Sequence, residues 1–214
     1  MDRSLRRDFA EALGADAVLQ SGELLAPATV EGVGTALLLA HQHGLAVRVT
    51  SGEGSRSTPP DGGVILSLVR LAGVSVDPAK GIARAEAGAT IESLRAALAA
   101  HNLTVPGLPS QPRSLHTGSL VARGEVPRRS LTGVDAILPE GELVRLGAAV
   151  LKDVVGYDLT SALLGSEGRL AVIATLHLRL APAGARLPTP DATGPRSVAE
   201  LAPVLDPEGI LAGA

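Results

Sequence analysis

The chain has 214 residues, of which 45% are hydrophobic, 1% are aromatic and 19% are charged. This length and apolar content suit one large or two small folded domains. The lack of cysteine excludes a disulfide scaffold, a thiolate metal site, an iron–sulfur cluster and a cysteine nucleophile within the chain. A formal net charge of −3 and the scarcity of aromatic rings give no support for nucleic-acid binding or for adhesion to an anionic membrane.

Targeting signals are not found at the start of the sequence. Three arginines among the first seven residues resemble the start of a signal peptide, but Asp8 and Glu11 follow instead of an apolar run. The most apolar window, residues 36–47, is interrupted by polar side chains and is shorter than a membrane span requires. We expect a cytoplasmic protein without direct membrane insertion, peripheral to a membrane only through a partner.

The predicted elements of the first half come from apolar spacing and turn residues. Leu5, Phe9 and Leu13 recur every four residues, which indicates one face of a helix. Thr29 is a favourable N-cap for a second helix, and Gly44 suits its C-terminal end. This half is predicted to contain helices over 3–13, 30–43 and 90–101, and strands over 47–50, 64–68, 73–76 and 82–87.

The second half begins with a stretch, 106–129, that shows little periodicity. A hairpin is predicted around Pro139-Glu140-Gly141. The elements predicted around and after this turn are strands over 134–138 and 143–146, a helix near 159–164 and a strand over 170–180. Residues 183–214 read as a Pro/Gly/Ala-rich tail with one short helix opened by Ser197. Strands and helices mix without strict alternation, which predicts an α+β fold.

The strongest local signal is a loop of small residues directly after the 47–50 strand. In it, Gly52 and Gly54 permit positive φ and a close ligand approach, Ser55 adds a hydroxyl donor and Arg56 adds positive charge. Successive backbone N–H groups in such a loop can form a nest that binds phosphate oxygens. The loop is followed by Pro59-Pro60 rather than by a helix, so it is not a Rossmann loop or a P-loop. An ordinary surface loop remains the alternative.

No catalytic or metal-binding group of standard spacing is present. His116 lies in a glycine-containing loop, so a ligand role stays open, whereas His177 alternates with leucines in a strand and is expected at the surface. No cluster of His, Asp and Glu has metal-ligand spacing, and no serine lies in a nucleophile elbow. The catalytic residues are therefore left unassigned, and no metal site is predicted.

A second informative stretch is Lys152-Asp153-Val154-Val155-Gly156-Tyr157-Asp158-Leu159. Asp158 is placed to cap the helix that Leu159 opens, and Tyr157 is the only tyrosine of the chain. The residues themselves are equally consistent with a structural role and with a functional one.

Several motifs occur in the order found in one known family. They are Pro27 with the helix after it, Val47-Arg48-Val49 into Ser51-Gly52-Glu53-Gly54-Ser55, Ala87-Gly88-Ala89-Thr90, Thr117-Gly118-Ser119-Leu120-Val121-Ala122, and Gly165-Ser166-Glu167-Gly168 into Val172-Ile173. In this order the chain resembles the FAD-binding PCMH-type domain, the domain of the vanillyl-alcohol-oxidase type, over about residues 18–182. The Lys152–Leu159 stretch is most similar to the small FAD-binding subunit of bacterial glycolate oxidase.

The resemblance implies a set of cofactor-binding residues. The 51–56 loop would wrap the FAD pyrophosphate, Pro109 and the 117–122 segment would line the flavin, and the strand through Ile173 would touch it with its backbone. The implied set is Ser51, Gly52, Glu53, Gly54, Ser55, Arg56, Pro109, Thr117, Gly118, Ser119, Val121, Ala122 and Ile173. No His or Cys lies in the 51–57 loop, so non-covalent FAD is expected.

The resemblance also implies an architecture and a role. The FAD-binding domain would cover residues 1–182 in two lobes, roughly 1–87 and 88–182, without the C-terminal substrate (cap) domain. The chain would be an FAD-dependent oxidoreductase subunit, catalytically incomplete alone, of a multi-subunit 2-hydroxy-acid (glycolate-type) oxidase or dehydrogenase. Its partners would be a larger flavoprotein subunit and an iron–sulfur subunit, which together form a hetero-oligomer.

Departures from the family pattern support an alternative. Glu53 interrupts a run of glycines, Ser119 stands where relatives have a second glycine, Ala171 replaces a glycine, and the stretch between Arg129 and Val134 is short. The alternative is a degenerate flavin fold that acts as a structural subunit without bound FAD. A third reading, the FAD subunit of a molybdenum hydroxylase, fits the 156–159 run less well.

Overall fold

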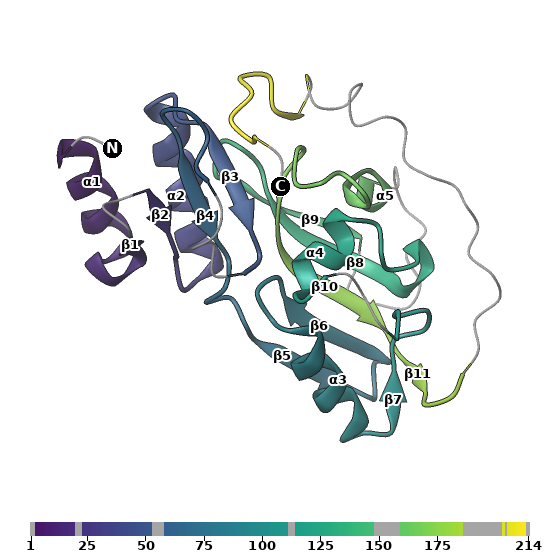
Figure 1. Ribbon diagram of the computed structural model, residues 1–214. Coiled ribbons are helices and arrows are strands. Elements are labelled where there is room, and N and C mark those ends of the chain that lie inside the picture. The colour runs from purple at the N-terminus through teal and green to yellow at the C-terminus, as the bar shows by residue number, and fades with distance from the viewer. Residues whose placement is uncertain are drawn as a thin grey trace.

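The computed structural model describes residues 3–19, 23–52, 58–110, 114–147, 159–185, 203 and 205–212. These residues form two lobes, each built around its own sheet (Figure 1). The mixture of helices with parallel and antiparallel strands confirms the predicted α+β class. Among the helices described, none has the length and apolar content needed to cross a bilayer.

The first lobe holds a four-stranded sheet with the order β1-β2-β4-β3. Its strands are β1 (Val18–Leu19), β2 (Leu24–Leu25), β3 (Val47–Thr50) and β4 (Val64–Ser67). β4 pairs in parallel with both β2 and β3, whereas β1 and β2 are antiparallel. Helices α1 (Arg3–Leu13) and α2 (Val30–Gln42) lie beside this sheet, and a single 3-10 turn (Ala15–Ala17) follows α1.

The two helices form where their apolar faces and caps predict them. Thr29 Oγ1 accepts a hydrogen bond of 3.0 Å from the backbone N–H of Gly32, so α2 starts with one of its free donors satisfied. Gly44, with φ of +62°, follows the end of α2 and adopts the left-handed conformation that a glycine tolerates. Phe9 of α1 and Leu37 of α2 are fully buried in the first core.

The second lobe holds a five-stranded antiparallel sheet with the order β5-β6-β10-β8-β9. Its strands are β5 (Val74–Asp77), β6 (Ile82–Glu86), β8 (Leu131–Ile137), β9 (Leu143–Gly147) and β10 (Val172–Arg179). The other elements are α3 (Ile91–Ala99), α4 (Thr117–Ala122), α5 (Leu159–Leu163), a 3-10 turn (Arg128–Ser130), and the short pair β7 (Leu103–Thr104) and β11 (Ala181–Pro182). Helix α4 lies within the stretch that showed no periodicity.

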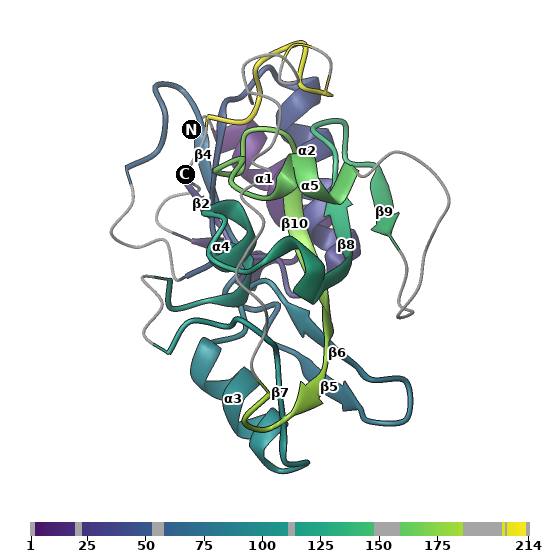
Figure 2. The ribbon, with the colours of Figure 1, turned by 90° about the vertical axis from the view of Figure 1, so that its right-hand side faces the viewer.

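The central strand β10 belongs to both cores. Val172 and Ala174 are buried in the core of the first lobe, whereas Ile173, Leu176 and Leu178 are buried in the core of the second. A shift of register between Ile173 and Thr175 accompanies this arrangement. The strand runs along the middle of the second sheet beside β8 (Figure 2). Strand β10 therefore packs against both lobes.

The sheets divide the chain at a different place from the expected lobe boundary at residue 87. The first sheet ends at Ser67 and the second begins at Val74, so β5 and β6 belong to the second sheet, where β6 pairs with β10. The assignment of β6 to the second sheet could not be predicted from local sequence, because its partner strand β10 lies about ninety residues further along the chain. Thr175 of β10, for example, lies opposite Glu86 of β6.

His177 is placed differently from the surface position expected for it. Its imidazole is only 13% exposed, and Nε2 lies 3.3 Å from Asp135 Oδ1 on the neighbouring strand β8. Next to it, Arg84 of β6 donates a hydrogen bond of 3.2 Å to Thr175 Oγ1. The alternation of apolar and polar residues along β10 places His177 on the face of the strand opposite its leucine neighbours. Side chains of the two adjacent strands, such as Arg84 of β6 and Asp135 of β8, cover that face.

Part of the predicted tail returns to the first lobe. The backbone N–H of Val47 donates to Ile210 O at 2.6 Å, and Ala212 N–H donates to Val47 O at 2.9 Å, so residues 210–212 pair with the outer edge of β3. Ile210 and Leu211 are buried in the first core. We call residues 205–212 the C-terminal arm. The short helix expected from Ser197 lies outside the described residues.

The arm is held in shape by a buried carboxylate. Asp206, 7% exposed, accepts hydrogen bonds of 2.9 and 2.8 Å from the backbone N–H groups of Ile210 and Leu211. Replacing Asp206 by Ala leaves these two buried donors without an acceptor. Asp206→Ala is therefore expected to lower the free energy of unfolding by about 1–3 kcal/mol, measured by urea denaturation.

Glu208→Ala is the matched control for this variant. The Glu208 carboxylate is 60% exposed and lies 3.5 Å from His41 Nδ1. Its removal is expected to change stability by less than about 0.5 kcal/mol. Equal effects of the two variants would contradict a structural role for the Asp206 hydrogen bonds.

Candidate cofactor site between the lobes

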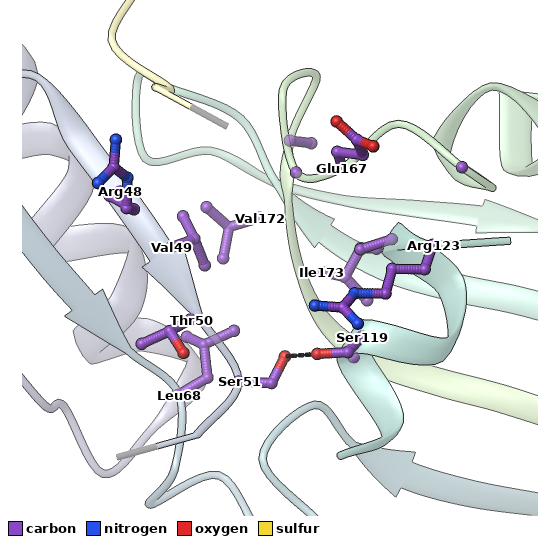
Figure 3. Close-up of a pocket in the computed structure, with 15 residues that line it drawn as sticks. Arg48, Val49, Thr50, Ser51, Leu68, Ser119, Arg123, Glu167, Val172 and Ile173 are labelled. Atoms are coloured by element: carbon purple, nitrogen blue, oxygen red, sulfur yellow. Dashed lines mark hydrogen bonds between the residues drawn. The ribbon is translucent and has the colours of Figure 1, made fainter. Parts of the chain in front are cut away.

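A cavity of about 500 Å³ lies between the two lobes (Figure 3). The first lobe contributes the end of β3 and the residue after β4, namely Arg48, Val49, Thr50, Ser51 and Leu68. The second lobe contributes residues of and next to α4, namely Gly118, Ser119, Ala122 and Arg123. The remaining wall is formed by Gly165, Glu167, Gly168 and the segment 171–173 at the start of β10.

The loop after β3 is anchored at both of its described ends. Gly52 N–H donates to Thr50 Oγ1 at 3.3 Å, and Gly52 O accepts a hydrogen bond of 2.6 Å from the buried Ser67 hydroxyl. At the other end, Arg48 Nη1 donates to Thr58 O at 2.6 Å. The side chains of β3 and β4 thus fix where the loop leaves the sheet and where it returns.

Helix α4 approaches the first lobe at a glycine. Gly118 N–H donates to Ala87 O at 2.9 Å. A β-carbon at this position would lie 2.7 Å from Ser51 Oγ and 2.8 Å from Ala87 Cβ, so only glycine permits the contact. The next residue, Ser119, joins the lobes directly, because its hydroxyl is hydrogen-bonded to the Ser51 hydroxyl at 3.3 Å (Figure 3).

The wall between α5 and β10 is a turn with left-handed backbone. Gly165, Glu167 and Gly168 have φ of +81°, +54° and +74°. No atom lies within 4 Å of the place where a β-carbon of Gly165 or Gly168 would be, so these glycines are needed for conformation and leave open space. The Glu167 carboxylate is exposed and lies 3.5 Å from Arg169 Nη2. The single carboxylate in the wall is therefore already paired with a cation.

Five of the residues expected to bind the cofactor line this cavity: Ser51, Gly118, Ser119, Ala122 and Ile173. Gly52 is the next residue of the same loop, and a β-carbon there would lie 3.1 Å from the His116 ring. Glu53, Gly54, Ser55 and Arg56 lie outside the described residues, as does the 152–158 stretch with Tyr157.

Three other expected residues are placed elsewhere. Thr117 is buried, and its hydroxyl donates to Glu86 O at 2.5 Å, so it fastens α4 to β6. Val121 is fully buried in the second core and does not line the cavity. The Pro109 carbonyl accepts a hydrogen bond from the Arg95 guanidinium on α3, away from the cavity walls.

Sequence reasoning missed several lining residues. Gly165 and Gly168 belong to one of the ordered motifs, and two glycines that flank a polar pair indicate a tight turn. Arg48 and Val49 belong to another of these motifs, in which the sequence predicts a strand and no binding role. Arg123 gave no signal, because it follows a six-residue helix in a stretch without periodicity. In the described part of the chain, no three His, Asp or Glu side chains are grouped as a metal site would require.

The comparison with family models matches residues 23–147 to the family described as FAD binding domain. The chain belongs to this FAD-binding family, as the order of its motifs indicated. The match ends before the turn at 165–168 and strand β10, which complete the cavity.

Several curated proteins have sequences similar to this chain. The chain is 32% identical over 168 residues to an uncharacterised FAD-linked oxidoreductase of Mycobacterium tuberculosis, covering 73% of this chain and 37% of the relative. It is 29% identical to a D-lactate dehydrogenase of Archaeoglobus fulgidus (73% and 38%) and 24% identical to glycolate oxidase subunit GlcD of Bacillus subtilis (74% and 37%). The chain thus spans somewhat more than a third of the length of these relatives.

Solved structures show the same fold at lower identity. Wild-type Phl p 4.0202, a glucose dehydrogenase, superposes with a TM-score of 0.60 at 20% identity, over 74% of this chain and 34% of that one. An alkyldihydroxyacetonephosphate synthase superposes with a TM-score of 0.59 at 19% identity, over 74% and 31%. These similarities establish the two-lobed fold.

The residues of the cavity fit FAD. The volume lies in the range of about 300–1,000 Å³ typical of small-molecule sites. Two serine hydroxyls and two guanidinium groups can bind phosphate oxygens, and the apolar residues Val49, Leu68, Val172 and Ile173 border the same cavity. The open space beside Gly165 and Gly168 lets backbone approach a flat ligand closely.

Replacing Gly118 tests whether the close contact between α4 and Ser51 shapes the cavity. Gly118→Ala adds a β-carbon where 2.7 Å separates it from Ser51 Oγ, so α4 and the loop must move apart. We expect a loss of stability of about 1–3 kcal/mol and a clear drop in FAD affinity, measured by thermal denaturation and by flavin fluorescence titration.

Ser119→Ala serves as the comparison for this variant. It removes only the hydroxyl that bonds Ser51 at 3.3 Å and adds no atoms. We expect it to keep most of the stability. A Gly118→Ala protein that binds FAD as the wild type does would show that this contact is not part of the site.

Proposed function

We propose that the chain binds FAD non-covalently in the cavity between its lobes. The observation that carries this proposal is the cavity itself, in which hydroxyl and guanidinium donors face apolar side chains, within a chain of the FAD-binding family. Non-covalent attachment is supported by the sequence, because the chain has no cysteine and the 51–57 loop has no histidine.

Different residues of the cavity would bind the charged part and the ring of FAD. The anchored loop start and the serine pair would hold the charged part of the cofactor, because their donors are fixed before the ligand arrives. Val172 and Ile173 would pack against the ring and exclude water from it. FAD, when bound, supplies the hydride and electron chemistry.

We further propose that the activity is the oxidation of a 2-hydroxy acid of the glycolate type. The names of the relatives from Archaeoglobus fulgidus and Bacillus subtilis support this substrate class. The chain would pass electrons through its flavin within a larger enzyme, together with a larger flavoprotein subunit and an iron–sulfur subunit. Because the chain has no cysteine, any iron–sulfur cluster would be bound by such a partner.

Titration of the purified protein with FAD tests the cofactor proposal. Flavin fluorescence should change saturably on binding, and the visible flavin spectrum should remain with the protein after gel filtration. Saturating FAD should also raise the unfolding temperature, since about 100 Kd of ligand adds roughly 2.7 kcal/mol of stability. Acid precipitation should release all of the flavin into the supernatant.

The outcome separates the proposal from its alternative. A folded protein that shows no fluorescence change and no thermal shift with FAD would be a structural subunit with a degenerate flavin fold. Flavin that stays in the acid precipitate would contradict non-covalent binding.

Purification of the tagged chain from cells of its source tests the partner proposal. We expect it to elute with a larger protein that carries flavin and with a protein that contains iron and acid-labile sulfide, both measured chemically. The mixture should reduce a dye with glycolate or D-lactate, whereas the chain alone should not. Elution as a monomer with full dye-reducing activity would contradict this arrangement.

A further inference from the structure

Among the described residues, two arginines line the cavity, Arg48 and Arg123. Of these, Arg123 lies outside all the sequence motifs that indicated the FAD-binding family. It directly follows α4, and its backbone N–H donates to Ser119 O at 3.0 Å, which fixes its position relative to the helix. Its side chain lies along the α4 wall, and the guanidinium is directed into the space that Ser51 and Ser119 border (Figure 3).

The other charged groups of the cavity already have partners. Arg48 donates to Thr58 O at 2.6 Å, and Glu167 lies 3.5 Å from Arg169. Among the interactions of the described residues, none involves the guanidinium of Arg123. Arg123 therefore contributes a positive charge and a fork of five donors that the described protein atoms leave available.

Three donors from two lobes converge on one end of the cavity. The Ser51 and Ser119 hydroxyls use one hydrogen bond between them, which leaves each with further bonding capacity. An arginine fork beside two hydroxyl groups matches a phosphate group, whose oxygens accept several bonds at once. The anionic side chain of the cavity wall, Glu167, is exposed and lies 3.5 Å from Arg169, whose charge offsets part of its own.

We propose that Arg123 is a phosphate-binding residue, which acts with Ser51 and Ser119 on the pyrophosphate of the bound dinucleotide. This inference rests on the proposed function, because it assigns the charged part of FAD to one end of the same cavity. It extends phosphate recognition from the loop after β3 to the end of α4, so that both lobes contact the same anionic group.

The test compares Arg123→Gln with the wild type for three probes: FAD, ADP and riboflavin. Because riboflavin carries no phosphate, its affinity should stay the same. The affinities for FAD and for ADP should each fall about 10- to 100-fold, which is the effect of losing a charge-assisted contact. Weaker dependence of FAD binding on salt concentration should accompany this loss, because one ion-pair contact is gone.

Two further variants control for charge and for folding. Arg145→Gln removes an exposed arginine on β9 that does not line the cavity, and it should bind all three probes as the wild type does. Arg123→Lys keeps the charge but not the fork, so its affinity for FAD and ADP should be intermediate. Thermal denaturation without ligand should show the same stability for Arg123→Gln and the wild type, since Arg123 is exposed.

The possible contrary results are distinct. Unchanged affinity of Arg123→Gln for FAD and ADP would overturn the inference and leave the proposed function standing. If Arg123→Gln lost affinity for riboflavin as much as for FAD, Arg123 would contact the flavin ring. If only the KM for a 2-hydroxy acid changed in the assembled enzyme, Arg123 would bind the substrate carboxylate. Either result overturns the phosphate assignment. A wild type that binds neither FAD nor ADP would overturn both proposals.

Discussion

The arrangement of the molecule depends on strand β10, whose first residues pack into two hydrophobic cores. Val172 and Ala174 are buried against the first lobe, whereas Ile173 and Leu176 are buried in the second, so neither core is complete without this strand. Burial of apolar surface is the main favourable term in folding, and here it also fixes how the lobes face each other. The cavity between the lobes therefore has a wall that belongs to both of them.

The chemistry of the cavity follows from the kinds of backbone that surround it. Where strands end and a helix begins, side chains and backbone donors project beyond the sheet, which explains why Ser51 and Ser119 meet there. The start of β10 instead presents aliphatic side chains, because this segment must also fill the cores. A ligand with a charged part and a flat apolar part finds both kinds of surface within one cavity. A ligand with only one of them would leave the other surface unused.

Much of the fold could be predicted from local signals. Helices α1, α2 and α3 and strands β3 to β6 follow from apolar spacing and from caps such as Thr29 and Thr90, whose hydroxyl accepts from Ser93 N–H at 3.0 Å. The order of glycine motifs led to the family and to five lining residues. The pairing of β6 with β10 and the place of Arg123 could not be predicted, because both depend on contacts between segments distant in the sequence. The two-residue strands β1, β2, β7 and β11 are too short to show any alternation.

The C-terminal arm has a consequence for the order in which the protein forms. Val47 completes its backbone hydrogen bonds only with Ile210 and Ala212, which are synthesised long after the rest of the first sheet. Until then the N–H and C=O groups of Val47, at the start of the outer edge of β3, are open to pairing with other chains. A nascent chain would therefore pass through a state with an open sheet edge, and pairing over such a sequence separation is intrinsically slow.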